Sequence, residues 1–198
     1  MKVTILNQTV YFGMQVPLSS FPKLLQDHLK ENPTTPDIER FGTNLAATNF
    51  FENDTREFVK KVCEWGGYSG IAGRVLKQNS ITDICNGLRE ASSILTTGKS
   101  VADALMRVNK LRSLGTPFFA SKHLRFLQPD LCGVFDSILD EVLPYSFDPA
   151  GYSDFCTDCS AVAKELAAKG VSNPRMRVGG GWYVADVEGA LYTFALQL

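Results

Sequence analysis

Residues 101–137 read VADALMRVNKLRSLGTPFFASKHLRFLQPDLCGVFDS, and this stretch decides our interpretation of the fold. Its apolar spacing predicts one helix over 101–111 and a second over 117–127. Ser100 is a favoured N-cap for the first helix, and Thr116 followed by proline is a typical start for the second. The stretch therefore predicts two consecutive helices with a very short connection.

The connection, Arg112–Thr116, makes these two helices a tight hairpin. Gly115 can adopt a positive φ, which would turn backbone N–H groups of the loop outward together. Such amides, beside the N-terminus of the second helix, form a natural phosphate site, and the basic residues Lys110 and Arg112 flank them. Short glycine turns are common in helical proteins, so the hairpin alone does not identify a function.

The remainder of the chain has mainly helical signals as well. Caps, prolines and apolar spacing predict helices over about 20–30, 36–47, 54–65, 80–98 and 153–169, a short one after Asp136, and a last one after Gly181. The first residues differ, because 2–12 alternate around Asn7-Gln8 and predict a β-hairpin. We therefore expect a mainly α protein with a short N-terminal β-hairpin, folded as one domain over residues 1–198.

Charge is distributed unevenly along the chain. The formal net charge is only −1, which by itself argues against general nucleic-acid binding. From Lys99 to Arg125, however, six basic residues and one acid give +5 and leave −6 for the remainder. A solvated basic face is one explanation, and an electrostatic footprint for phosphate is the other.

The five cysteines are odd in number and scattered, unlike a disulfide framework. Cys156 and Cys159 are the one close pair, but a zinc or iron–sulfur site needs further Cys or His at short spacing, and the two histidines lie far away at positions 28 and 123. We expect no metal and no cofactor.

No apolar run reaches the roughly 18 residues of a membrane span, and the N-terminus lacks a signal-peptide core, so a cytoplasmic protein is expected.

The segment LGTPFFASKHLRFLQPDLCGVFDS (114–137) resembles the helix-hairpin-helix DNA glycosylases, closest to bacterial relatives of 8-oxoguanine DNA glycosylase. In that family a Leu-Pro-Gly-apolar-Gly hairpin precedes an apolar-x-Asp signature, which corresponds here to Val134-Phe135-Asp136. Trp65-Gly66-Gly67 and the segment GWYVADVE (181–188) add to the resemblance, which covers about residues 58–198. The resemblance implies a helix-hairpin-helix glycosylase-like fold with its hairpin core at 101–143. It also implies a protein that acts as a monomer on double-stranded DNA.

Asp136 is the residue to which the resemblance gives the central catalytic role. Cleavage of an N-glycosidic bond builds positive charge on the sugar, and a nearby carboxylate stabilises that cation or activates a nucleophile. Asp136 also stands where a helix begins, so an N-cap is its structural alternative. One carboxylate can perform both roles.

The lysine of the family is not at its usual position. Relatives that also cut the backbone carry a nucleophilic lysine two residues after the second hairpin glycine, where this chain has Pro117. Lys122, on the same helix between Phe118 and Phe126, is the second catalytic candidate, because a desolvated amine can attack the sugar carbon. The alternatives for Lys122 are a snorkelling side chain or a phosphate contact, and the alternative chemistry uses water.

Further residues are candidates for binding DNA or the extruded base. The expected DNA contacts are Lys110, Arg112, Ser113, Gly115, Thr116 and Arg125. The base-pocket candidates are Trp65, Trp182 and Asp186, with Tyr183 and Glu188 as weaker ones. Aromatic side chains can stack on an extruded base, although each of these aromatic residues is equally compatible with a place in the hydrophobic core. His123 lies on the apolar face of its helix, which indicates a buried histidine.

Three classes of function fit these observations. The first is a DNA glycosylase that excises a modified base, either an oxidised purine such as 8-oxoguanine or, as in relatives linked to phage defence, a hypermodified cytosine. The second is a non-catalytic helix-hairpin-helix DNA-binding or adaptor module, which would not need a carboxylate at Asp136. The third is a helical protein-interaction domain, which predicts no DNA affinity.

Overall fold

Ten α-helices and one small β-sheet make up the part of the chain that the computed structural model describes, which is residues 2–98, 100–115 and 117–198. The helices are α1 (Phe21–Glu31), α2 (Thr35–Ala47), α3 (Glu52–Trp65), α4 (Ser69–Gln78), α5 (Ile81–Thr96), α6 (Val101–Asn109), α7 (Pro117–Leu127), α8 (Ser137–Val142), α9 (Pro149–Ala168) and α10 (Val184–Ala195). The mainly helical prediction is confirmed. None of these helices has the length and apolar character needed to cross a membrane.

The N-terminal hairpin forms as predicted and continues into a third strand. Strands β1 (Thr4–Leu6), β2 (Thr9–Tyr11) and β3 (Gln15–Pro17) pair antiparallel in that order. Asn7 and Gln8 both have positive φ, at 49° and 62°, which is the geometry of the tight turns that suit twisted hairpins. The third strand is too short to leave a clear alternating pattern in the sequence.

Predicted and observed helices agree closely, with one omission. Ser80 and Ser100 cap α5 and α6 as expected, since their side chains accept hydrogen bonds from backbone N–H groups at 3.0 and 3.1 Å. Helix α4 was not predicted, because its sequence SGIAGRVLKQ contains two glycines, poor helix formers, and Tyr68 before it makes no side-chain cap. Its presence shows that packing against α3 outweighs local preference.

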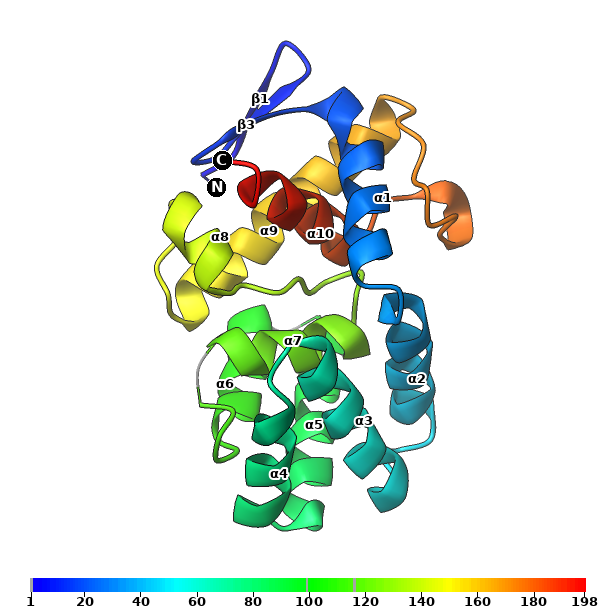
Figure 1. The fold of residues 1–198 in the computed structure, drawn as a ribbon, viewed down its shortest axis with the longest axis vertical. Coiled ribbons are helices and arrows are strands. Elements are labelled where there is room, and N and C mark those ends of the chain that lie inside the picture. Colours follow the sequence, from blue (N-terminus) through cyan, green and yellow to red (C-terminus); the bar gives the residue numbers. More distant parts are fainter. Residues whose placement is uncertain (1, 99, 116) are drawn as a thin grey trace.

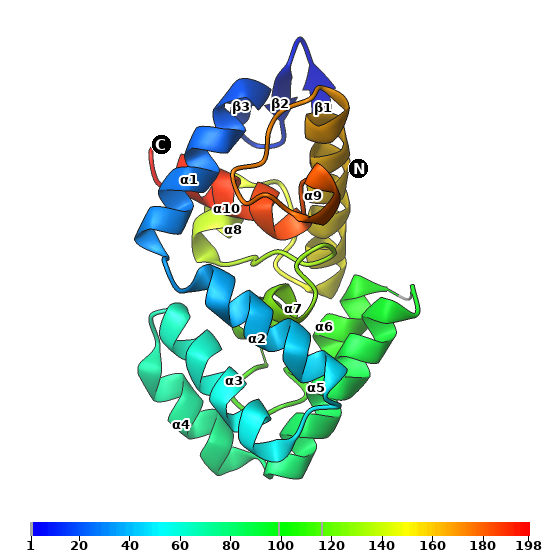
Figure 2. The same cartoon turned by 90° about the vertical axis from the view of Figure 1, so that its right-hand side faces the viewer.

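The chain forms two halves that are stacked end to end (Figure 1). The sheet, α1, α8, α9 and α10 make the upper half, and α2 to α7 make the lower half, so the chain descends after α1 and returns after α7 (Figure 2). Helix α1 packs against α10 in the upper half, and α6 reaches across to α9. Buried apolar side chains from both halves form one continuous hydrophobic core.

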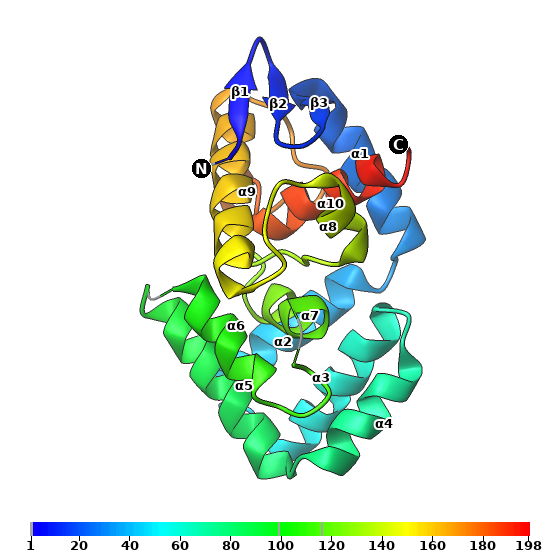
Figure 3. The same cartoon turned by 90° about the vertical axis from the view of Figure 1, so that its left-hand side faces the viewer.

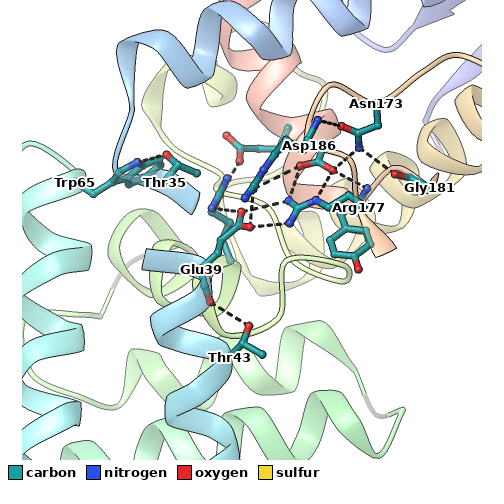
Figure 4. A network of polar contacts seen from close by, with 12 residues as sticks. Thr35, Glu39, Thr43, Trp65, Asn173, Arg177, Gly181 and Asp186 are labelled. Carbon is teal, nitrogen blue, oxygen red and sulfur yellow. Dashed lines mark hydrogen bonds and ion pairs between the residues drawn. The ribbon is translucent and has the colours of Figure 1, made fainter. Parts of the chain in front are cut away.

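A buried ionic network joins the two halves (Figure 4). We call it the Glu39 cluster, and its members are Glu39, Arg125, Arg175, Arg177 and Asp186. The Glu39 carboxylate on α2 accepts hydrogen bonds from the guanidinium groups of Arg125 at 2.8 Å, Arg175 at 2.5 Å and Arg177 at 2.8 Å. Burial by itself would raise the pKa of Glu39, but the three cations outweigh it and lower the pKa to about 2. The carboxylate therefore stays ionised and holds α2 and α7 to the segment before α10.

Candidate active site

A cleft of about 720 Å³ lies where the two halves meet. Its walls come from the end of α1, the α3–α4 turn, α7, the start of α8, and α10. The side chains that line it include the aromatic residues Trp65, Tyr68, Phe118, Phe119 and Tyr192 and the ionisable residues His28, Lys122, Asp136 and Glu188. Figure 3 shows the side of the molecule where α7 of the lower half lies below α8 of the upper half. A largely apolar hollow with a few polar groups is the usual form of a small-ligand site.

The structure brings the two predicted catalytic residues, Lys122 and Asp136, into this one cleft. Lys122 projects from α7 and is only 6% exposed. Burial lowers the pKa of its amine, while the charges of Asp136 and Glu188 act in the opposite direction. The ammonium lies 5.8 Å from the centre of the Phe119 ring. Of the two phenylalanines expected to flank the lysine, Phe118 lines the cleft, whereas Phe126 is buried against Trp65.

Asp136 is the N-cap of α8, as the structural alternative predicted. Its Oδ1 accepts a long hydrogen bond of 3.4 Å from the backbone N–H of Leu139. The same carboxylate lines the cleft and is close enough to Lys122 and Glu188 to influence the pKa of both. The cap fixes the position of the carboxylate and leaves it facing the cleft.

The hairpin between α6 and α7 is tight, but its geometry differs from the prediction in one respect. Ser113, with φ of 68°, carries the left-handed conformation, and Gly115 does not adopt a positive φ. The turn is held by α4 and the residue after it: Arg112 N–H donates to the side chain of Asn79 at 2.9 Å, and the Ser113 hydroxyl donates to Gln78 at 2.9 Å. These two contacts tie the loop down. Thr116 lies outside the described residues.

Not all of the predicted DNA contacts are at the surface. Lys110, Arg112 and Gly115 are exposed, as a phosphate contact requires. Arg125 is a correction, because it is only 1% exposed and is bound to Glu39. Its sequence neighbourhood resembled a basic surface, but the helix turns this arginine into the Glu39 cluster.

An exposed cation that the sequence analysis missed lies beside the hairpin. Arg74 on α4 shares a second hollow with Ser113 and Gly115, and Tyr68 and Phe119 line both that hollow and the cleft. The hairpin and the cleft are therefore adjacent. The sequence analysis could not place Arg74 beside the hairpin, because it did not predict α4.

The three base-pocket candidates have different positions. Trp65 lines the cleft, and its indole N–H donates to the Thr35 hydroxyl at 2.8 Å. Trp182 is a correction, since it is buried in the core against Phe21 and donates to the carbonyl of Val171.

Asp186 is also a correction. It is fully buried, outside the cleft, and its carboxylate accepts hydrogen bonds from Arg177 and Asn173. It also accepts the Tyr183 backbone N–H at the start of α10. The role of this acid is to cap a helix and to neutralise the buried arginines.

The structure adds to the site one ionisable residue that sequence reasoning did not single out, His28, and it places Glu188, a weaker base-pocket candidate, there as well. His28 near the end of α1 and Glu188 on α10 both line the cleft. Burial raises the pKa of Glu188 to about 7, against the opposing effects of Arg125 and the Val134 amide. Burial, assisted by Arg125 and Arg175, lowers the pKa of His28 to about 4. Tyr192, four residues after Glu188 and therefore on the same face of α10, also lines the cleft.

His123 and the cysteines are structural. His123 is buried as predicted, with Nδ1 2.7 Å from the carbonyl oxygen of Phe119. All five cysteines are free and buried, and Cys156 and Cys159 lie inside α9. Among the residues described, no group of three or more His, Cys, Asp or Glu side chains is arranged to hold a metal ion.

No protein-family model matches the chain, and neither a curated protein nor a solved structure is significantly similar to it.

Proposed function

We propose that this protein is a DNA glycosylase that excises a modified base from double-stranded DNA. The observation that carries the proposal is the meeting of Lys122 and Asp136 in one cleft with aromatic walls. A lysine and a carboxylate beside an aromatic pocket suit the cleavage of a glycosidic bond in an extruded nucleotide. The sequence of residues 111–137 resembles that of the helix-hairpin-helix glycosylases, which favours the same chemistry.

The two residues would act on the same electron-deficient sugar carbon. The bond between the sugar C1′ and the base nitrogen breaks, its electron pair leaves with the base, and positive charge builds on the sugar. The Asp136 carboxylate would stabilise that charge. The burial that lowers the pKa of Lys122 favours the neutral amine, which would bond to C1′ as the base leaves. The C1′–O4′ bond of the sugar ring would then break to give the Schiff base, and the two protons of the amine would pass to the departing base and to O4′. If Lys122 only positions the substrate, water takes the place of the amine.

Access to DNA is the second support for the proposal. The exposed cations Lys110, Arg112 and Arg74 surround the hairpin, and the hairpin adjoins the cleft through Tyr68 and Phe119. A duplex held at the hairpin by its phosphates would thus present a nucleotide to the cleft without a large movement of the protein. We propose a monomeric enzyme that acts on cytoplasmic DNA.

The substrate would be an oxidised purine such as 8-oxoguanine or a hypermodified cytosine. The test is a panel of duplexes that each carry one modified base, scored for abasic sites. The expected result is release of at least one base by the wild type and its loss in Asp136→Asn, which keeps an oxygen to cap α8. A control duplex without modification should stay intact. Wild type that binds these duplexes and releases no base would contradict the proposal.

The second candidate is a non-catalytic DNA-binding module. One observation favours it: capping of α8 already gives Asp136 a structural role. This alternative predicts that the protein binds duplex DNA at the hairpin and breaks no covalent bond of the DNA. It also predicts that Asp136→Asn binds the duplex with unchanged affinity. The same panel therefore separates the two functions.

A further inference from the structure

Two buried polar side chains line the cleft in addition to Lys122 and Asp136. His28 reaches it from α1 and Glu188 from α10. They are only 3% and 1% exposed. Neither side chain has a part in the chemistry described above, so their presence in the cleft needs its own explanation.

Each of these side chains has a polar atom without a hydrogen-bond partner among the described residues. These atoms are Nε2 of His28 and Oε2 of Glu188. The nearest cation to Oε2 is Nε of Arg125 at 3.7 Å, which is beyond hydrogen-bond distance. Buried polar atoms in native proteins almost always have partners, because leaving one unpaired is unfavourable. The residues that carry these two atoms line one cleft, where a ligand can supply the partners that the protein does not.

The backbone leaves room for both side chains at two glycines. A Cβ atom on Gly189 would lie 2.9 Å from Cδ2 of the His28 ring, and one on Gly133 would lie 2.9 Å from Cβ of Glu188. Real Cβ atoms essentially never come so close to other heavy atoms. The positions of His28 and Glu188 therefore depend on the absence of side chains at these glycines.

Aromatic rings surround the pair. The His28 ring makes edge contacts with Trp65, at 6.5 Å between ring centres, and with Tyr192, at 5.9 Å. A planar ring with polar atoms on its edge fits such surroundings, because its faces can stack and its edge can form hydrogen bonds.

We propose that His28 and Glu188 form the polar floor of the cleft and select a nucleobase that carries an exocyclic amino group. This inference rests on the proposed function, since it names the class of base that the glycosylase would take. The amino group would donate an N–H to the Glu188 carboxylate, as amino groups of bases do to acidic side chains. The neighbouring ring atom would pair with Nε2 of His28.

The chemistry of both groups suits this role. His28 is neutral near pH 7, because its pKa is about 4, so its Nε2 can donate or accept according to the tautomer. An N–H donor next to Glu188 would favour the carboxylate and lower its pKa from about 7. Guanine and cytosine derivatives have an exocyclic amino group, whereas uracil, thymine and hypoxanthine lack it. Both candidate substrates belong to the first class.

The first experiment measures base release from duplexes in matched pairs. One pair carries 8-oxoguanine or 8-oxohypoxanthine, and the other 5-hydroxymethylcytosine or 5-hydroxymethyluracil, so that members differ in the amino group. We expect the wild type to prefer the amino base, and Glu188→Gln and His28→Phe to lose about tenfold or more of that release, as for loss of a hydrogen bond to a charged group. Glu165→Gln on the surface of α9 and His123→Gln in the core are the matched controls.

A structural role for the two residues would give a different result. Affinity for a duplex with a tetrahydrofuran abasic analogue reports on folding and on phosphate contacts, because that site has no base. We expect all four variants to keep this affinity within about twofold. Equal losses on the abasic duplex and on the base duplexes would overturn the inference, as would a wild type that prefers the bases without an amino group.

The second experiment does not depend on catalysis or on DNA. In Trp182→Phe the remaining tryptophan is Trp65, which lines the cleft, and its fluorescence reports on occupancy. Cytidine with uridine, and deoxyguanosine with deoxyinosine, are titrated into this variant and into its Glu188→Gln derivative. We expect the amino nucleosides alone to change the fluorescence, and the change to need Glu188. If this holds while no duplex is cut, the proposed function fails and the polar floor stands. If duplexes are cut but Glu188→Gln changes neither assay and His28→Phe does not change base release, the polar floor fails alone.

Discussion

The alkyl chain of Lys122 lies directly against Gly66: a Cβ atom on that glycine would be 3.0 Å from both Cδ and Cε of the lysine. Gly66 ends α3, at the start of the turn that forms one wall of the cleft. A side chain at this position would therefore push the lysine out of the place that it has in the cleft. The Trp65-Gly66-Gly67 segment, noted as part of the glycosylase resemblance, thus has a physical role in placing a candidate nucleophile.

This contact predicts the effect of Gly66→Ala. The φ of Gly66 is −73°, so alanine suits the backbone and the added methyl group must displace Lys122 instead. We expect the free energy of unfolding to change by less than about 1 kcal/mol, because a long side chain can shift. Base release should fall about tenfold through misplacement of the amine. Gly181→Ala, where a Cβ meets nothing within 4 Å, is the control, and equal activity of both variants would contradict this account.

The Glu39 cluster predicts a large effect far from the cleft chemistry. Glu39→Gln removes the charge that neutralises the buried Arg125 and the largely buried Arg175 and Arg177. We expect the free energy of unfolding to fall by about 3–5 kcal/mol, as for other broken buried ion pairs, measured by urea denaturation. Asp37→Asn, which removes the exposed pair with Arg40 on the same helix, should cost about 0–1 kcal/mol. Similar losses in the two variants would show that the cluster is not a main link between the halves.

DNA binding should depend on salt through the hairpin. Lys110 and Arg112 are exposed there, and each phosphate contact contributes about −0.9 to the slope of log affinity against log salt. The double variant Lys110→Ala, Arg112→Ala should therefore flatten this slope by about 2. Replacing Lys60, an exposed residue of α3, should leave the slope unchanged. An unaltered slope in the double variant would place the duplex elsewhere on the surface.

Stability should respond to pH through Glu188. The unfolded carboxyl has a pKa near 4.5 and the folded one about 7, so between these values the folded state holds a proton that the unfolded state has lost. The stabilising contribution of the neutral group is therefore complete below about pH 4.5 and is lost as the pH rises to about 7. In urea denaturation, Glu188→Gln should gain stability relative to the wild type over this window. His28 and His123 have pKa values lowered to about 4, so below pH 6.5 they make the folded state more stable as the pH rises. Both histidines are present in the wild type and in the variant, so their effect cancels in the difference between the two proteins. A constant difference between the two proteins across this pH range would contradict the prediction.

Much of this fold and part of the site could be predicted from local sequence. The turn at Asn7-Gln8 and the caps at Ser80 and Ser100 act within a few residues, and the structure confirms them. Lys122 and Asp136 are only fourteen positions apart on consecutive elements, and they do share a cleft.

The wrong predictions concern residues whose partners are distant in sequence. Arg125 was assigned to DNA, but its partner Glu39 lies 86 positions away. Trp182 and Asp186 were assigned to the base pocket, but both form hydrogen bonds with the segment between α9 and α10, to Val171 and Asn173, and neither lines the cleft. His28 was missed for the same reason, because only the packing of α1 on α10 brings it to the cleft. Periodicity shows which face of a helix is apolar, and it does not show which helix covers that face.

The last prediction decides between an amine and water as the nucleophile. Lys122 is almost fully buried, and that burial lowers its pKa, which favours the neutral amine that a nucleophilic attack needs. An attack on C1′ gives a Schiff base that borohydride reduces to a stable covalent bond between protein and DNA. We expect a trapped complex with wild type on a confirmed substrate, and none with Lys122→Gln. Asp136→Asn should slow formation of the complex without removing the amine, and Lys110→Gln at the hairpin should still trap. Base release by the wild type without a trapped complex, or equal trapping with Lys122→Gln, would assign the reaction to water and leave Lys122 a role in positioning the sugar.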